Sequence, residues 1–170
     1  MNVYDGLVRY GSGTLRLQTN DFLNCRATAT LPDYPIYGGA LYMFDPGDVF
    51  ISGCDFIQCT ADSSGGDIYA RTNDTSSTLT IENSHFSRTE AHAARTGGSI
   101  YATKFAMEMR ESTWEGFQST SEGGAFWVRD GDLYLLECAF KNCASTYGGA
   151  IFMQGGNIAM EDCGFRNNEA

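Results

Sequence analysis

The stretch LYLLECAF, residues 133–140, returns 25 residues later as IAMEDCGF, residues 158–165. Both follow one pattern: an apolar residue, a spacer, an apolar residue, two spacers, a small residue, a spacer and an aromatic. The 170-residue chain contains six copies of this pattern, some of them degenerate, and a phrase repeated at such intervals is typical of a solenoid. The six aromatics are Phe22, Phe56, Phe86, Trp114, Phe140 and Phe165.

A second phrase, two glycines followed by mainly apolar residues, lies between the aromatics. It reads GGALYM (38–43), GGDIYA (65–70), GGSIYA (97–102), GGAFWV (123–128) and GGAIFM (148–153), with a degenerate copy, DGLVRY, at 5–10. The steps between glycine pairs are 27, 32, 26 and 25 residues, enough for short strands and turns. Both phrases alternate with a period of two, which indicates strands.

The repeats therefore predict an all-β fold, a parallel β-helix solenoid of about six coils of roughly 25–32 residues each. We expect a single domain over residues 1–170 with no cap at either end, and a right-handed coil because parallel crossovers have that hand. Stacking places equivalent residues in columns, in which successive residues are about 4.8 Å apart. The aliphatic, small and aromatic positions should face inward. So should the column three residues after the aromatic: Cys25, Cys59, Thr89, Phe117, Cys143 and Asn168.

The six cysteines allow 15 pairings. Cys25 and Cys59 hold equivalent positions in adjacent coils, as do Cys138 and Cys163, and adjacent strands bring Cα atoms within the disulfide range of about 4.4–6.8 Å. Two alternatives stay open. One joins Cys54 to Cys59 and Cys138 to Cys143 within a coil, and the other leaves six small buried thiols. The sequence favours the pairs between coils, because an inward aromatic separates the partners within a coil.

An aromatic column follows the glycine pairs, at Tyr42, Tyr69, Tyr101, Trp127 and Phe152. The neighbouring positions are aliphatic or apolar, and we expect those to face the core and the aromatics to form an outward stack. Three roles are open for this stack: stabilising the sheet by cross-strand pairing, packing laterally on another chain, or stacking on sugar rings.

The net charge of −10 argues against nucleic acid and anionic membranes as partners. We expect no membrane insertion by this segment, since it has no long apolar run. Acidic residues gather outside the second strand of each coil, at Glu82, Glu108, Glu111, Glu137, Glu161 and Asp162. A solvated face is the simplest interpretation; a face bridged by calcium-like cations is the alternative. No resident metal and no cofactor is expected.

Few residues suggest catalysis. Glu108, Arg110 and Glu137 would lie near each other on adjacent coils, but a charged face produces such groups by chance, so we expect no catalytic residue. His85 and His92 are interpreted as inert turn residues. Asn73 begins the sequon Asn-Asp-Thr in a polar turn, which makes it a candidate for N-glycosylation.

The motif Gly148-Gly149-Ala150-Ile151, followed by Phe165-Arg166-Asn167-Asn168, resembles the repeat of the chlamydial polymorphic outer membrane proteins. Gly38-Gly39-Ala40-Leu41 is close to it, whereas the other copies replace the last asparagine. The resemblance implies an extracellular structural or adhesive role at the cell surface, usually within a longer protein.

Together these features predict a non-enzymatic extracellular β-helix that stacks end to end into a fibre or forms part of a long surface array. Its partners would be further copies of itself, by end-to-end stacking or through the aromatic column, and glycans. The alternative function is a carbohydrate-binding or polysaccharide-cleaving β-helix.

Overall fold

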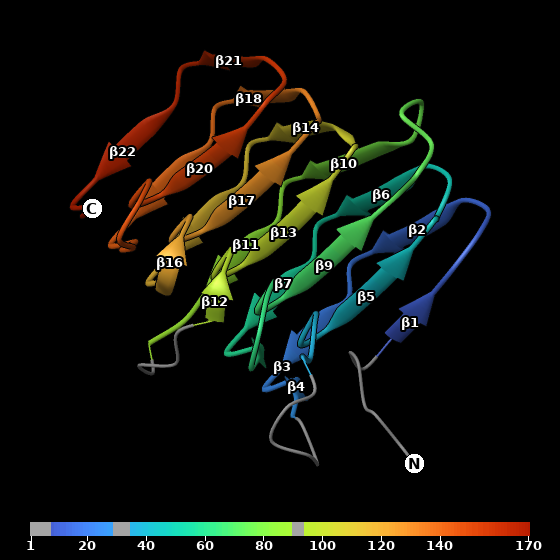
Figure 1. Ribbon diagram of the computed structural model, residues 1–170, viewed down its shortest axis with the longest axis horizontal. Helices are drawn as coiled ribbons and strands as arrows, with labels where there is room; N and C mark the ends of the chain where they lie inside the picture. The colour runs from blue at the N-terminus through green and yellow to red at the C-terminus, as the bar shows by residue number, and fades with distance from the viewer. Residues whose placement is uncertain (1–7, 29–34, 90–93) are drawn as a thin grey trace.

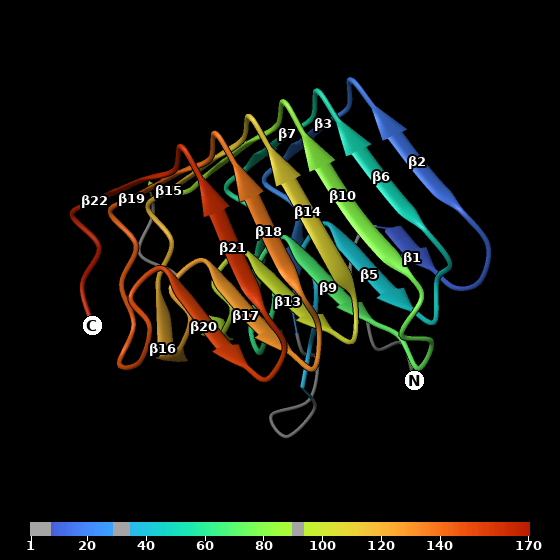
Figure 2. The same cartoon turned by 90° about the horizontal axis from the view of Figure 1, so that it is seen from above.

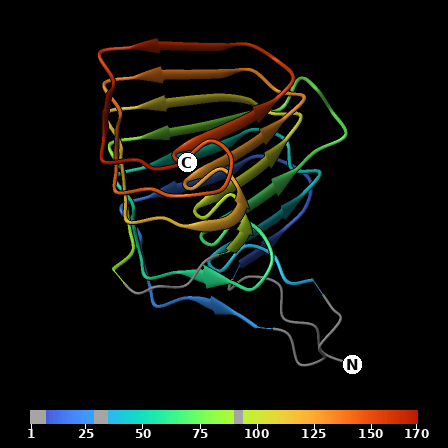
Figure 3. The same ribbon diagram turned by 60° about the vertical axis from the view of Figure 1, so that its left-hand side comes forward.

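The computed structural model describes residues 8–28, 35–89 and 94–170, and every regular element in these ranges is a β-strand. The strands stack into a parallel solenoid in which the chain returns to each sheet once per repeat (Figures 1 and 3). This confirms the predicted all-β parallel solenoid. The handedness and the number of full coils stay predictions.

Three six-stranded sheets form the sides of the solenoid (Figure 2). The first contains β1 (Val8–Tyr10), β5 (Leu41–Phe44), β9 (Ile68–Arg71), β13 (Ile100–Thr103), β17 (Phe126–Arg129) and β20 (Ile151–Gln154). The second contains β2 (Leu15–Gln18), β6 (Val49–Ser52), β10 (Thr78–Glu82), β14 (Ala106–Arg110), β18 (Leu133–Leu136) and β21 (Ile158–Glu161). The third contains β3 (Asp21–Leu23), β7 (Asp55–Ile57), β11 (His85–Ser87), β15 (Thr113–Glu115), β19 (Ala139–Lys141) and β22 (Gly164–Arg166).

Two short parallel pairs complete the described strands. They are β4 (Arg26–Ala27) with β8 (Thr60–Ala61), and β12 (Ala94–Thr96) with β16 (Ser119–Glu122). We use "level" for one strand of each six-stranded sheet, such as β17, β18 and β19. Pairing between levels is parallel and in register at every position that the repeat aligns, as in Phe86 with Trp114 and Leu79 with Met107.

Each glycine pair is required by the backbone. The first glycine has positive φ, as at Gly123 with φ 67°, and it turns the chain sharply into the first sheet. At the second glycine the next level comes too close for a side chain: a Cβ on Gly124 would lie 1.8 Å from the carbonyl oxygen of Gly149. The glycine pairs therefore fix both the turn and the close stacking.

The core consists of the inward columns that the repeat predicts. Phe86 is fully buried and its ring stacks on Phe56 at 4.6 Å and on Trp114 at 5.1 Å between centroids. The column continues through Phe140, and Phe126 of the first sheet packs edge-on against both Trp114 and Phe140. Stacked and edge-on pairs are the favoured aromatic geometries, so this column adds to the stability from burial.

One predicted inward position is wrong. Thr89 is exposed, and Arg88 is buried in its place, between Cys59 and Phe117 of the neighbouring levels. The step between glycine pairs is longest here, 32 residues, and the extra residues change which side chain points inward.

The two ends of the core differ. At the first level Phe22 is 7% exposed, whereas at the last level Ile158, Met160 and Phe165 are 44%, 45% and 47% exposed. Their equivalents one level earlier, Leu133, Leu135 and Phe140, are buried. The end formed by β20, β21 and β22 is thus open and apolar.

Candidate functional surfaces

The aromatic column after the glycine pairs lies on the outer side of the first sheet, because its neighbours Ile68 and Ala70 belong to the core cluster and Tyr69 does not. The rings are stacked and nearly parallel. Centroids are 5.3 Å apart for Tyr42 and Tyr69, 4.8 Å for Tyr69 and Tyr101, and 4.4 Å for Tyr101 and Trp127. Phe152 is paired with Trp127 in strand register and is half-buried.

This column is less exposed than an open binding stripe. Tyr69 and Trp127 are only 7% and 6% exposed. Tyr37, just before the first glycine pair, packs on Tyr69 with centroids 4.5 Å apart, and Glu122 accepts a hydrogen bond from the indole Nε1 of Trp127 at 2.8 Å. The geometry fits a self-stacking column with accessible edges; roles in lateral packing or sugar binding stay predictions.

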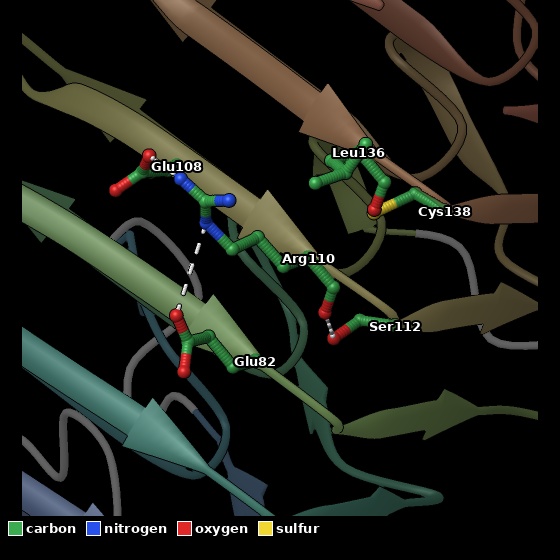
Figure 4. Close-up of polar contacts among 6 residues, drawn as sticks. All are labelled: Glu82, Glu108, Arg110, Ser112, Leu136 and Cys138. Carbon is green, nitrogen blue, oxygen red and sulfur yellow. Dashed lines mark hydrogen bonds and ion pairs between the residues drawn. The ribbon is translucent and has the colours of Figure 1, made fainter. Parts of the chain in front are cut away.

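The outer side of the second sheet carries a charged cluster (Figure 4). Arg110 lies between two carboxylates of adjacent strands: it donates to Glu108, and its Nε is 3.8 Å from Oε1 of Glu82. The cluster differs from the predicted group in one member. Arg110 is paired in register with Glu82 on β10 and with Leu136 on β18, and Glu137 follows Leu136 at a corner with φ 53°. The carboxylate of the adjacent strand beside Arg110 is therefore that of Glu82 rather than Glu137.

A groove of about 340 Å³ lies beside this cluster, across β10, β14, β18 and β21. Small side chains at Ala106 and Ala159 leave room on the outer face, and the walls include Glu108, Asp132 and Tyr134. An apolar floor with a few polar walls is the usual composition of a small-molecule site. Figure 4 shows the charged edge of this surface.

A buried polar cluster was not anticipated. Asp67 stands in the column that holds Ala40, Ser99, Ala125 and Ala150 in other levels, and it is fully buried. Its Oδ2 accepts a hydrogen bond of 2.6 Å from the Ser99 hydroxyl. Burial raises the pKa of Asp67 to about 7, although the Arg88 guanidinium and the Ser99 hydroxyl both act to lower it.

Arg88 occupies the interior beside this carboxylate. Its guanidinium donates to the carbonyl oxygens of Cys59 and, at 3.3 Å, Gly98, and it lies over the Phe117 ring at 5.1 Å. Burial lowers the pKa of Arg88, and the nearby Asp67 opposes that change. The sequence signal that could have revealed this cluster is Asp67, a charged residue at a position where other repeats have Ala or Ser.

The six cysteines are free thiols in the structure. The register of the flanking strands aligns Cys25 with Cys59 and Cys138 with Cys163. Phe56 and Phe140 lie between the partners of the within-coil alternatives and are fully buried. The two bridges between coils stay predictions. Burial raises the pKa of Cys138 and Cys143 to about 11, and burial followed by the charge of Asp67 raises that of Cys59, so these thiols resist forming the reactive thiolate.

The remaining candidates lie in turns or at strand edges. Asn73 is exposed, and its Nδ2 donates to Oδ2 of Asp45 at 3.1 Å; its glycosylation stays a prediction. His85 Nδ1 is 2.6 Å from the Thr113 hydroxyl. His92 lies outside the described residues. Within residues 8–28, 35–89 and 94–170 no group of three or more His, Cys, Asp or Glu side chains is placed to hold a metal ion.

No helix in the described part of the chain has the length and apolar character needed to cross a membrane. No protein-family model, curated protein or solved structure matches this chain. The class of protein that the structure defines is therefore a parallel β-solenoid, and its function has to be argued from its surfaces.

Proposed function

We propose that this chain is a non-enzymatic structural or adhesive solenoid of the cell exterior, which lengthens by accepting parallel strands at the open end of its core. The observation that carries the proposal is the last level, where Ile158, Met160 and Phe165 are each almost half exposed. An apolar surface of this kind at the edge of three sheets favours the addition of strands, because it offers both burial and unpaired backbone groups.

Only strands with the repeat's own pattern fit this end. They need aliphatic residues opposite Ile158 and Met160 and an aromatic opposite Phe165, since every earlier level pairs those positions in register. More of the same polypeptide would supply such strands in a long array, and another copy would supply them in a fibre. Both give a rod that grows along one axis, because each level is bonded only to its neighbours on that axis.

The extracellular part of the proposal rests on the sequence. Gly148–Ile151 and Phe165–Asn168 resemble the repeats of the chlamydial polymorphic outer membrane proteins, and a surface protein of that type would be structural or adhesive. The six cysteines suit an oxidising compartment, where bridges between coils would form during folding. The partners proposed are copies of the chain and glycans at the outer surfaces.

Extension of the chain tests this directly. Appending a further copy of residues 146–170 keeps the repeat in phase, because Ser145 and Ala170 occupy equivalent positions. We expect the longer protein to bury Phe165 and to unfold at higher denaturant concentration. An extended protein in which the added copy stays unstructured would contradict the proposal.

Association of the 170-residue chain tests the fibre form. Size-exclusion chromatography and negative-stain imaging over a concentration series should show assemblies that Met160→Glu disperses. Leu23→Glu is the matched control, since Leu23 is 55% exposed but lies on the outer side of β3. A wild-type protein that stays monomeric at every concentration would remove the fibre form.

A second candidate function is carbohydrate binding, favoured by the groove beside Tyr134 and the Glu82–Arg110–Glu108 cluster. Carboxylates next to an aromatic ring match the hydroxyl groups and apolar faces of sugars. A glycan array with wild type and Tyr134→Ala, together with a uronate-lyase assay, tests it. No binding and no cleavage would remove this candidate.

A further inference from the structure

Four tyrosines converge on the outer side of the first sheet. Tyr69 is in ring contact with each of the others: Tyr37 at 4.5 Å, Tyr101 at 4.8 Å and Tyr42 at 5.3 Å between centroids. By contrast, Tyr10, Tyr134 and Tyr147 contact no other tyrosine ring in the described part of the chain. A cluster this dense has chemical consequences beyond packing.

Phenol oxidation is the chemistry that such a cluster supports. Removing one electron and one proton from a tyrosine gives a radical whose unpaired spin resides on the oxygen and the ortho carbons. Two such radicals form one carbon–carbon bond between ortho carbons, after which the two ortho hydrogens move to the phenol oxygens. The pair loses two electrons and two protons in all, and hydrogen peroxide, acting through a peroxidase, accepts them and becomes two waters.

The geometry selects one pair. Tyr69 and its stacked neighbours Tyr42 and Tyr101 are almost parallel, at 4° and 7°, so their rings must rotate before ortho carbons can bond. Tyr37 is tilted by 33° to Tyr69, and this pair has the shortest separation between tyrosine rings, so it departs from the parallel arrangement at the closest approach. Tyr37, Tyr42 and Tyr101 are half-buried, so an oxidant reaches them from solvent, while Tyr69 is only 7% exposed. Tyr69 would be oxidised by giving an electron to a radical on a neighbouring ring and losing its phenol proton; the oxidant then oxidises that neighbour again.

We propose that Tyr37, Tyr42, Tyr69 and Tyr101 form an oxidative cross-linking site, at which a peroxidase-type oxidant joins tyrosines of neighbouring levels, Tyr37 with Tyr69 first. The link would tie the segment before β5 to β9. It restricts the unfolded chain as a disulfide does and stabilises the folded solenoid by that route. Trp127, whose ring centroid is 4.4 Å from that of Tyr101, would compete with the tyrosines to be oxidised. The site is independent of the proposed function.

The test oxidises the dilute, purified chain with peroxidase and hydrogen peroxide. We expect the monomer to lose the mass of two hydrogen atoms, to gain dityrosine fluorescence and to yield a cross-linked peptide containing Tyr37 and Tyr69. Tyr69→Phe keeps the ring stack but lacks the phenol, and it should lose the cross-linked peptide. Tyr134→Phe is the control on another sheet and should behave as wild type.

Two results would overturn the proposal. One is dityrosine only between chains, through Tyr147, which is 61% exposed. The other is oxidation of Trp127 with no dityrosine at all. Tyr101→Phe controls for a folding defect in Tyr69→Phe. It retains the Tyr37–Tyr69 pair, so it should still form the cross-link. Loss of the cross-link in Tyr101→Phe with an unchanged circular dichroism spectrum would count against the assigned pair.

Discussion

Truncating the inward aromatic column should lower the free energy of unfolding far more at a middle level than at the last level. Phe86 is fully buried between Phe56 and Trp114, with centroids 4.6 Å and 5.1 Å away. Phe86→Ala removes a ring from a closed core, and such changes cost about 3–5 kcal/mol. Phe165 is 47% exposed, and among the described residues it stacks on one ring, that of Phe140, with centroids 5.1 Å apart. Phe165→Ala loses only about half of the free energy of burying the ring, together with one stacked pair. It should therefore lower the free energy of unfolding by about 1–2 kcal/mol.

Urea unfolding followed by circular dichroism measures both costs. The midpoint should fall at least twice as far for Phe86→Ala as for Phe165→Ala, with unchanged slopes, because the slope reports the surface exposed on unfolding. Equal shifts of the midpoint for the two variants would contradict this expectation, because they would mean that the last level is covered as well as the middle ones. A changed slope would show that the levels do not unfold together.

Three further predictions follow from single residues. The pKa of Asp67 is about 7 in the folded state against an ordinary value of 3.8, so the folded state holds the Asp67 proton more tightly than the unfolded state does. The stability that this proton contributes is present at low pH and is lost as the pH rises through 7. Unfolding midpoints at pH 5 and pH 8 should therefore differ more in wild type than in Asp67→Asn. Gly124→Ala should abolish folding because its Cβ would lie 1.8 Å from a carbonyl oxygen, while Gly164→Ala, with no atom within 4 Å, should unfold as wild type does. Arg110→Ala should leave the thermal unfolding midpoint close to that of wild type, since the ion pairs of Arg110 are exposed to solvent; a large drop would show that the charged cluster stabilises the fold.

The repeat predicted most of the fold because columns are a direct consequence of in-register stacking. The inward aromatic and aliphatic columns follow from spacing alone. The prediction failed where spacing changed: at the step of 32 residues, the longest of the four, Arg88 is buried and Thr89 is exposed. Spacing along the chain cannot show which of two adjacent residues a loop insertion rotates into the core.

The surfaces were less predictable than the core. The stacking of Tyr69 and Tyr101 followed from the repeat, but the packing of Tyr37 against Tyr69 did not, because Tyr37 lies before the glycine turn that folds it back. Glu137 was expected beside Arg110, but it lies at a corner with positive φ, one residue past the position that pairs with Arg110. Corner geometry, which a sequence repeat does not specify, decided both.

Equivalent residues of the solenoid stack in register along one axis, and distances between pairs of spin labels can measure this stacking. Gln18 shares one outer column with Arg110, Leu136 and Glu161, which lie three, four and five levels away. At about 4.8 Å per level, backbone separations from Gln18 should be about 14, 19 and 24 Å, rising by one constant step. Distances by pulsed electron paramagnetic resonance that increase by this step would support the solenoid. Separations that do not increase with the number of levels would contradict it.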